Sequence, residues 1–325
     1  MAEIIPQENA LARAAALIAA GEVVAIPTET VYGLAADATS GEAVARIFEA
    51  KRRPRFNPLI AHVANIAMAR EHAEFGPLAL KLAETFWPGP LTLVLPLVAS
   101  SPIHPLVTAG LDTIAIRMPR STFTRALIAE LGRPLAAPSA NRSGRISATT
   151  AADVEAELGD GIPLIVDGGP TPVGVESTIV GVDGDRLVLL RPGGVASGDI
   201  EEAAGRKLEL AAAGNVIAPG MLASHYAPKS AVRLGVSEVV PGEALLAFGP
   251  QRADGADKAV AVSNLSVSGD LREAAAALFS ALRALDRTGA STIAVEPVPD
   301  HGLGEAINDR LRRAAAPRDS AGGDD

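Results

Sequence analysis

The hydrophobic pattern of the first 205 residues alternates between a helical period and short apolar runs. Leu11–Ala20 is rich in Ala and Leu and predicts a helix ended by Gly21, because glycine is common just after a helix C-terminus. Val23–Ile26 is mostly β-branched and predicts a strand, and Ser40 can cap a helix that runs to Ala50. The same patterns predict further strands at Leu59–Val63, Leu91–Leu97, Thr113–Arg117, Leu135–Ala137, Leu164–Asp167, Ser177–Val182 and Leu187–Arg191, and helices at Pro77–Phe86, Thr122–Leu131 and Thr150–Leu158.

This interleaving of helices and strands predicts an α/β fold with a sheet of mixed strand directions. The turn Val182–Asp185 contains Asp-Gly and predicts one antiparallel hairpin. A length of 325 residues suits two domains at roughly 150 residues each. We expect a first domain over residues 1–206.

The pattern changes after residue 206. Residues 207–230 lack a clear period and predict a linker. Residues 231–316 predict a smaller α/β domain, and the polar residues 317–325 predict a disordered tail. The elements expected in the smaller domain are strands at Val232–Leu234, Ala244–Phe248, Val260–Ser263 and Thr292–Val295, and helices at Asp270–Thr288 and Leu303–Ala315.

Composition excludes several classes of protein. Hydrophobic residues make up 48% of the chain, yet no apolar run approaches the roughly 18–20 residues that cross a bilayer, so we expect no membrane anchor. The first residues lack the basic start and apolar block of a signal peptide, and there is no cysteine. These features predict a cytoplasmic protein. The net charge of 29 − 38 = −9 argues against a broad nucleic-acid footprint.

Common catalytic signatures are missing from the sequence. There is no G-x-x-x-x-G-K-[ST] phosphate loop and no G-x-S-x-G elbow. The five histidines never fall at metal-ligand spacing, so we expect no protein-built metal site.

Polar and basic residues recur instead where predicted strands and helices end. Pro27–Leu34 follows a strand, where ligands often bind in α/β sheets, although a capped turn is an equally good explanation. Lys51–Leu59 holds four cations in five residues beside two prolines, which favours a polyphosphate ligand over a solvated helix end. Arg117, Ala137–Gly144 and three later segments follow other strands; the later ones are Asp167–Pro170, Gly174–Thr178 and Arg191–Gly194.

Together these segments closely resemble the YrdC-like threonylcarbamoyl-AMP synthases. The matching motifs are PTETVYGL (27–34), the K-x-R-P element (51–54) with Asn57-Pro58-Leu59, IRMP (116–119), APSAN (137–141), STI (177–179) and RPG (191–193). PGMLASHYAP (219–228) and GLGEAINDRL (302–311) resemble the linker and C-terminal domain of the family's long form. The resemblance implies a YrdC-like twisted mixed sheet with flanking helices and a concave site, followed by a smaller Rossmann-like α/β domain.

The resemblance also implies the reaction and its substrates. L-threonine, bicarbonate or CO2, and ATP would give L-threonylcarbamoyladenylate and pyrophosphate. This is the first step toward N6-threonylcarbamoyladenosine at position 37 of tRNAs that read codons beginning with adenine. A downstream threonylcarbamoyl-transferase complex would take the product to tRNA.

By motif position, the resemblance implies two groups of site residues and a catalytic set drawn from them. The threonine group is Thr30, His62, Arg117, the Ala137 backbone and Ser177. The ATP group is Lys51, Arg53, Asn57, Thr113, Ser139, Asn141, Ser147, Arg191 and, from a linker that covers the active site, Tyr226. Lys51, Arg53 and Arg117 would be catalytic.

The physical chemistry agrees with this set. A carbamate is already an anionic nucleophile, so the site must mainly hold two anions and neutralise the reacting phosphate, which suits Lys and Arg. Mg²⁺ would be held through the ATP phosphates. Two alternatives stay open: a non-catalytic RNA-binding module that uses the same concave surface, and the related carbamoyl-adenylate chemistry of hydrogenase-maturation carbamoyltransferases. The latter carry zinc fingers, which a chain without cysteine cannot build.

Overall fold

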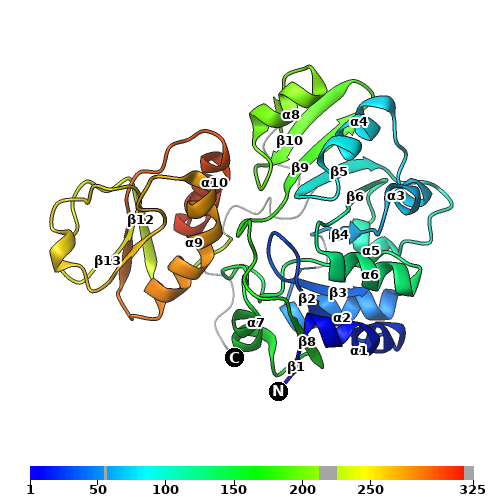
Figure 1. Cartoon of the computed structure of the whole chain (residues 1–325), viewed down its shortest axis with the longest axis horizontal. Coiled ribbons are helices and arrows are strands. Elements are labelled where there is room, and N and C mark those ends of the chain that lie inside the picture. Colours follow the sequence, from blue (N-terminus) through cyan, green and yellow to red (C-terminus); the bar gives the residue numbers. More distant parts are fainter. Residues whose placement is uncertain (55–56, 212–224, 318–325) are drawn as a thin grey trace. The chain divides into compact units, whose positions relative to one another are not determined.

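The computed structural model of the chain describes residues 1–54, 57–211 and 225–317. Contacts within the chain divide it into two units (Figure 1). The first unit comprises Met1–Ser143 and Ser147–Met221, and the second comprises Gly144–Ile146 and Leu222–Asp325.

The first unit is built on an 11-stranded sheet of order β1-β8-β2-β3-β7-β4-β6-β5-β9-β10-β11. Parallel and antiparallel pairs are mixed, and the expected hairpin is the antiparallel pair β9–β10. The strands are β1 (Glu3–Pro6), β2 (Val24–Ile26), β3 (Gly33–Asp37), β4 (Ile60–His62), β5 (Leu91–Pro96), β6 (Thr113–Arg117), β7 (Leu135–Ala136), β8 (Leu164–Asp167), β9 (Thr178–Asp183), β10 (Arg186–Arg191) and β11 (Glu209–Leu210).

The helices described in the first unit pack their apolar faces against one another and the sheet. For example, α1 contacts α6, and α4 contacts α8. The helices are α1 (Gln7–Ala19), α2 (Gly41–Lys51), α3 (Ile66–His72), α4 (Pro77–Phe86), α5 (Pro105–Thr108), α6 (Thr122–Leu131), α7 (Ala151–Leu158) and α8 (Ser197–Ala204). Buried Ala, Val, Leu and Ile side chains form the core, as the aliphatic composition leads one to expect.

Helix α2 shows how the sequence places a charged residue inside the protein. The Ser40 side chain accepts the backbone N–H of Ala43 at 3.3 Å, which caps the helix N-terminus. Helix α2 buries Ala43, Val44, Ile47, Phe48 and Lys51. Ile47 and Lys51 are four residues apart, so the spacing that buries the apolar stripe also carries Lys51 inward.

The second unit has its own four-stranded sheet, and all its strand pairs are parallel. Its strands are β12 (Ala231–Leu234), β13 (Ala244–Ala247), β14 (Val262–Asn264) and β15 (Thr292–Val295), and its helices are η1 (Ala256–Lys258), α9 (Leu271–Asp286) and α10 (Leu303–Ala315). Helix α9 connects β14 to β15 and packs on β13, as a crossover between parallel strands requires. The predicted fold class, a mixed α/β sheet followed by a smaller α/β domain, is confirmed.

Several details differ from the sequence expectations. Strand β3 lies in a stretch where the sequence predicted only the end of a loop, and β1 was not predicted. The range 207–230, predicted as a linker, begins with β11, which pairs with β10. Residues 212–224 of that range, and 318–325 of the predicted tail, lie outside the described residues.

Candidate active site

Lys51 is a buried ammonium that faces the loop after β7. It is 1% exposed, and its Nζ donates to the carbonyl oxygens of Ser139, at 2.5 Å, and Asn141. Burial, followed by the nearby Arg53 charge, lowers the pKa of Lys51 well below its usual value. An ammonium has three N–H donors, so the two carbonyls leave one for an anionic ligand.

Arg53 and Asn57 form a second buried pair, just after α2. Arg53 donates through Nη2 to the Pro58 carbonyl at 3.0 Å and reaches the Asn57 carbonyl at 3.4 Å. Asn57 is fully buried, and neither atom of its side-chain amide has a hydrogen-bond partner among the described residues. Leaving a buried amide unsatisfied is costly, so this side chain is suited to a ligand.

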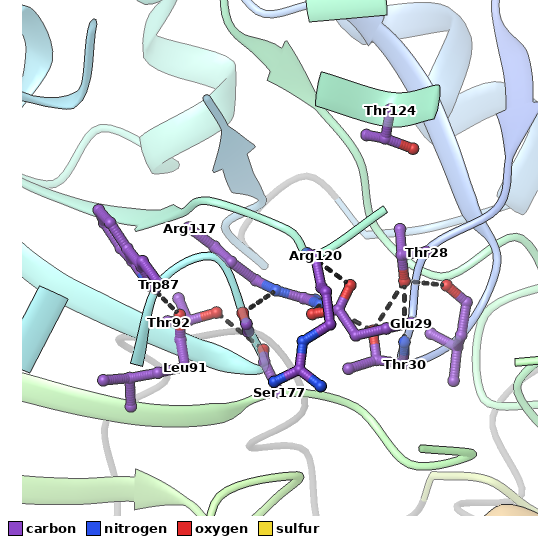
Figure 2. A network of polar contacts seen from close by, with 12 residues as sticks. Thr28, Glu29, Thr30, Trp87, Leu91, Thr92, Arg117, Arg120, Thr124 and Ser177 are labelled. Carbon is purple, nitrogen blue, oxygen red and sulfur yellow. Dashed lines mark hydrogen bonds and ion pairs between the residues drawn. The ribbon is translucent and has the colours of Figure 1, made fainter. Parts of the chain in front are cut away.

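Arg117 ends strand β6 and is fixed on three sides (Figure 2). Its Nη2 donates to Glu29 Oε1 at 2.5 Å, its Nη1 to Thr30 Oγ1 at 3.0 Å and its Nε to the Gly89 carbonyl at 3.1 Å. Thr28 and Thr30 share a further hydrogen bond of 2.9 Å. The motif PTETVYGL therefore meets the arginine motif directly, through Glu29 and Thr30.

His62 lies beside Arg117, because β4 and β6 pair in parallel with these two residues in register. Burial, and then the positive charge of Arg117, lowers the pKa of His62 to about 3. The imidazole is therefore neutral at physiological pH. Its Nδ1 lies 3.2 Å from the Ile60 carbonyl, which can only accept, so this contact is a hydrogen bond in the tautomer that carries the hydrogen on Nδ1.

Ser177 and Arg191 come together at the ends of β9 and β10. Arg191 Nη2 donates to the Ser177 carbonyl at 2.9 Å, and Ser177 Oγ lies 2.7 Å from Thr92 Oγ1. Ser177 is thus held by one predicted residue and by Thr92, which the sequence reasoning missed. Figure 2 draws the Thr92–Ser177 bond in the same network as Arg117.

Three further predicted residues make other contacts, and Ala137 shares the Ile60 carbonyl with His62. Ala137 donates its N–H to the Ile60 carbonyl at 3.1 Å, and Ser147 donates to Glu176 Oε1 at 2.5 Å. Thr113 lines a mainly apolar groove of about 520 Å³ beside Val94 and Leu190 and is the one predicted residue among its lining.

Tyr226 belongs to the second unit, where its ring is 1% exposed. The ring stacks on Phe279 with centroids 5.6 Å apart, and the Arg310 guanidinium lies 5.1 Å from its centroid. His225 packs beside it with ring centroids 4.0 Å apart. The contact of Tyr226 with the nucleotide stays a prediction.

Two carboxylates were also missed. Glu29 pairs with Arg117, and Glu176 accepts from Ser147. Glu29 could have been found, because it is the one carboxylate in a motif of hydroxyls and apolar residues. Nothing local to Glu176 marks Ser147 as its partner, because the two are 29 residues apart.

Comparison with known proteins identifies the family. A family model described as "Telomere recombination" (Sua5, YciO and YrdC) matches residues 16–193, and a model of the threonylcarbamoyl-AMP synthase C-terminal domain matches residues 195–316. The chain belongs to the Sua5/YrdC family of threonylcarbamoyl-AMP synthases. Both domains of the long form are therefore present.

The similarity to known proteins covers nearly the whole chain. The threonylcarbamoyl-AMP synthase of Bacillus subtilis is 42% identical over 332 residues, covering 97% of this chain and 96% of that protein. The crystal structure of Pyrococcus abyssi Sua5 in complex with L-threonine matches with a TM-score of 0.87 and 39% identity, covering 96% of this chain and 97% of that one. A variant of the same P. abyssi protein, in which a histidine and the tyrosine that follows it are replaced by alanine, matches with a TM-score of 0.86 and 37% identity, covering 97% and 96% of the two chains.

Membrane spans and metal-ligand clusters are both missing from the described residues. No helix among them is long and apolar enough to span a membrane. The described part of the chain also contains no group of three or more His, Asp or Glu side chains placed to hold a metal ion.

Proposed function

We propose that the protein makes L-threonylcarbamoyladenylate from L-threonine, bicarbonate or CO2, and ATP. The threonine amine combines with CO2 to give a carbamate, a carbamate oxygen attacks the α-phosphate of ATP, and pyrophosphate leaves. The observation that carries the proposal is the buried Arg117, which lies between hydroxyl groups and a neutral imidazole at the end of β6. The relatives named threonylcarbamoyl-AMP synthase, and the P. abyssi Sua5 complex with L-threonine, support it.

Threonine would bind with its carboxylate on Arg117. A guanidinium presents paired N–H groups that match a carboxylate. Neutral His62 keeps a lone pair on one ring nitrogen, which suits the hydroxyl proton of the substrate. Because the Ala137 N–H already donates to Ile60, a substrate donor would meet the Ala137 carbonyl. Thr30 and Ser177 complete this group.

ATP would bind through the second group of residues. Lys51 offers one N–H beside its two carbonyl partners, and Asn57 offers an unsatisfied amide. Arg53 adds positive charge next to Lys51. The other proposed contacts are Thr113, Ser139, Asn141, Ser147, Arg191 and Tyr226.

Catalysis would be electrostatic. The carbamate is already an anion, so the main barrier is to bring two anions together and stabilise charge on the reacting phosphate. Lys51, Arg53 and Arg117 are the cations assigned to this task. Mg²⁺ bound to the ATP phosphates would neutralise charge on the leaving pyrophosphate. A cation of this kind keeps several waters and binds mainly to phosphate oxygens, so it fits a site whose protein groups are cations, hydroxyls and amides.

Residues 207–230 are proposed to form a linker that covers the active site, and residues 231–316 a separate C-terminal domain. Tyr226 would contact the nucleotide. The P. abyssi Sua5 variant replaces a histidine and the tyrosine that follows it, and His225-Tyr226 is the one His-Tyr pair in this sequence. Covering the site would keep water from a reactive mixed anhydride.

The product would serve N6-threonylcarbamoyladenosine formation at position 37 of tRNA, through a downstream threonylcarbamoyl-transferase complex in the cytoplasm. A chain of net charge −9 is suited to handing over a small molecule rather than to gripping tRNA along many phosphates.

The test is pyrophosphate release with single omissions. The full chain is incubated with ATP, Mg²⁺, threonine and bicarbonate, and then with each substrate left out in turn. The proposal predicts release only when all are present. Release that does not depend on threonine, or salt-sensitive RNA binding without turnover, would contradict it.

A further inference from the structure

Glu29 is a buried negative charge that the proposed reaction leaves without a role. Its side chain is 4% exposed, and Oε1 accepts from Arg117 Nη2 at 2.5 Å (Figure 2). Its other oxygen, Oε2, accepts the backbone N–H of Arg120 at 3.0 Å. Burial alone would raise the pKa of this carboxyl, but the charge and hydrogen bond of Arg117, together with hydrogen bonds from the backbone of Glu29 and Arg120, lower it. Glu29 is therefore ionised at neutral pH.

The backbone around Glu29 is held as firmly as its side chain. The carbonyl of Glu29 accepts the N–H of Val173 at 2.9 Å, which ties it to the glycine-rich loop before β9. The next residue, Thr30, donates its N–H to Thr28 Oγ1 at 3.1 Å. A carboxylate fixed at both ends can act as a rigid support for its partner.

Counting donors shows what this support does to Arg117. A guanidinium has five N–H groups. Three are engaged within the described structure, by Gly89, Thr30 and Glu29, so 5 − 3 = 2 remain. One of the two is on Nη1 and the other is on Nη2. Two N–H groups on neighbouring nitrogens are what a single carboxylate needs for a two-point contact.

We propose that Glu29 is a positioning residue, which turns Arg117 so that one N–H of each terminal nitrogen is left for the α-carboxylate of threonine. The inference rests on the proposed function, since it takes threonine as the ligand of Arg117. Glu29 does not serve as a base, because both of its oxygens already accept hydrogen bonds from fixed donors. Its effect on threonine passes through Arg117 alone.

The first experiment compares Glu29→Gln with a matched control in the full chain. Glutamine keeps the size of the side chain but removes its charge and replaces one acceptor with a donor. We expect the threonine Kd to rise about tenfold or more, as for the loss of one charged hydrogen bond. The Michaelis constant for ATP should stay within about twofold, because in the described structure the Glu29 carboxylate contacts Arg117 and Arg120 and not Lys51, Arg53 or Asn57.

The control is Glu296→Gln, which removes a similar carboxylate from the second unit. Glu296 is 7% exposed, and it accepts from Arg252 Nη1 at 2.7 Å and from the backbone N–H groups of Phe248 and Ala253. This variant should lower the melting temperature to a similar extent and leave the threonine Kd unchanged. A purely structural Glu29 would behave in the same way.

A double-mutant cycle then tests whether Glu29 acts through Arg117. In an Arg117→Met background, Glu29→Gln should have no further effect on threonine affinity. The same loss in both backgrounds, or an unchanged threonine Kd in a normally melting Glu29→Gln protein, would overturn the inference. If Glu29→Gln does not fold, Glu29→Asp takes its place. This variant keeps the negative charge but moves it away from Arg117 by one methylene. An unchanged threonine Kd in Glu29→Asp would again overturn the inference. Absence of threonine binding by the unmodified chain would overturn the proposed function, and this inference with it.

Discussion

Replacing Lys51 with methionine tests the contribution of Lys51 to ATP binding separately from its contribution to the stability of the protein. Methionine is close to lysine in length and can occupy the same buried position at the end of α2, but it carries no charge. The change removes the Nζ contacts to the Ser139 and Asn141 carbonyls and the one N–H left for a phosphate. The effect on ATP follows from that last donor.

The expected loss of ATP affinity is roughly 10- to 150-fold, which corresponds to one charged hydrogen bond of about 1.5–3 kcal/mol. The effect on stability is the difference between two opposing terms. The two carbonyls lose a donor, at about 1–3 kcal/mol each if nothing replaces it. The penalty of burying the ammonium disappears at the same time, and this penalty is the main cause of the lowered pKa of Lys51.

The pKa shift also gives a sign to the pH dependence. Because the pKa of Lys51 is lower in the folded protein than in the unfolded chain, the unfolded chain binds more protons between the two values. The free energy of unfolding therefore rises with pH in that window, and Lys51→Met removes the rise. Phosphate favours the ammonium, so ATP binding should take up a proton and weaken as pH rises above the pKa of Lys51 in the folded protein.

Calorimetric titration of ATP in two buffers of different ionisation enthalpy measures both the affinity and the proton uptake. Lys81→Met is the matched control, because Lys81 is an exposed residue of α4. It should change neither quantity. An unchanged ATP affinity and unchanged proton uptake in a well-folded Lys51→Met protein would refute the reasoning.

Three further predictions concern other parts of the site. Arg117→Ala leaves buried Glu29 without its charge partner, so urea unfolding at pH 7.5 should show that the free energy of unfolding falls by about 3–5 kcal/mol. The fall should be smaller at pH 5, where the carboxyl can take up a proton. An equal fall at both pH values would contradict the pairing. Asn57→Leu removes an amide with no hydrogen-bond partner in the described structure, so the thermal melt should hold or rise while ATP affinity falls; unchanged ATP affinity would remove Asn57 from the site. Tyr226→Ala in the full chain should lower the yield of adenylate more than Tyr226→Phe, which keeps the ring stacked on Phe279; a yield equal to that of the unmodified chain would make the residue structural only.

Elements with strong local signals could be read from the sequence. Helix α6 has the predicted bounds Thr122–Leu131, because Ser121 caps its start and Gly132 ends it in a left-handed conformation. Strand β6 also has its predicted bounds, Thr113–Arg117. Strand β3, with the sequence Gly-Leu-Ala-Ala-Asp, has no β-branched residue; it is a strand because β2 and β7 pair with it on either side.

The residues of the candidate site also fall into those that the sequence predicts and those that it does not. Its cations and hydroxyls stand out in short motifs, so the amino-acid sequence is enough to name them. Their partners could not be named in this way, because tertiary pairing selects them: Glu29 and Arg117 are 88 residues apart, and Thr92 and Ser177 are 85 apart. Many other carboxylates in the sequence could have neutralised Arg117, and the fold decides which one does, because it brings the loop between β2 and β3 to the end of β6.

The most direct test of the account follows two isotopic labels into one product. The full chain is incubated with threonine, Mg²⁺, carbon-labelled bicarbonate and ATP labelled at the α-phosphate, and the products are separated quickly in the cold. The proposed reaction gives a single new compound that carries both labels in equal amounts, formed together with an equal amount of pyrophosphate. An adenylate that carries the phosphate label without the carbon label, or pyrophosphate release that does not need bicarbonate, would contradict it.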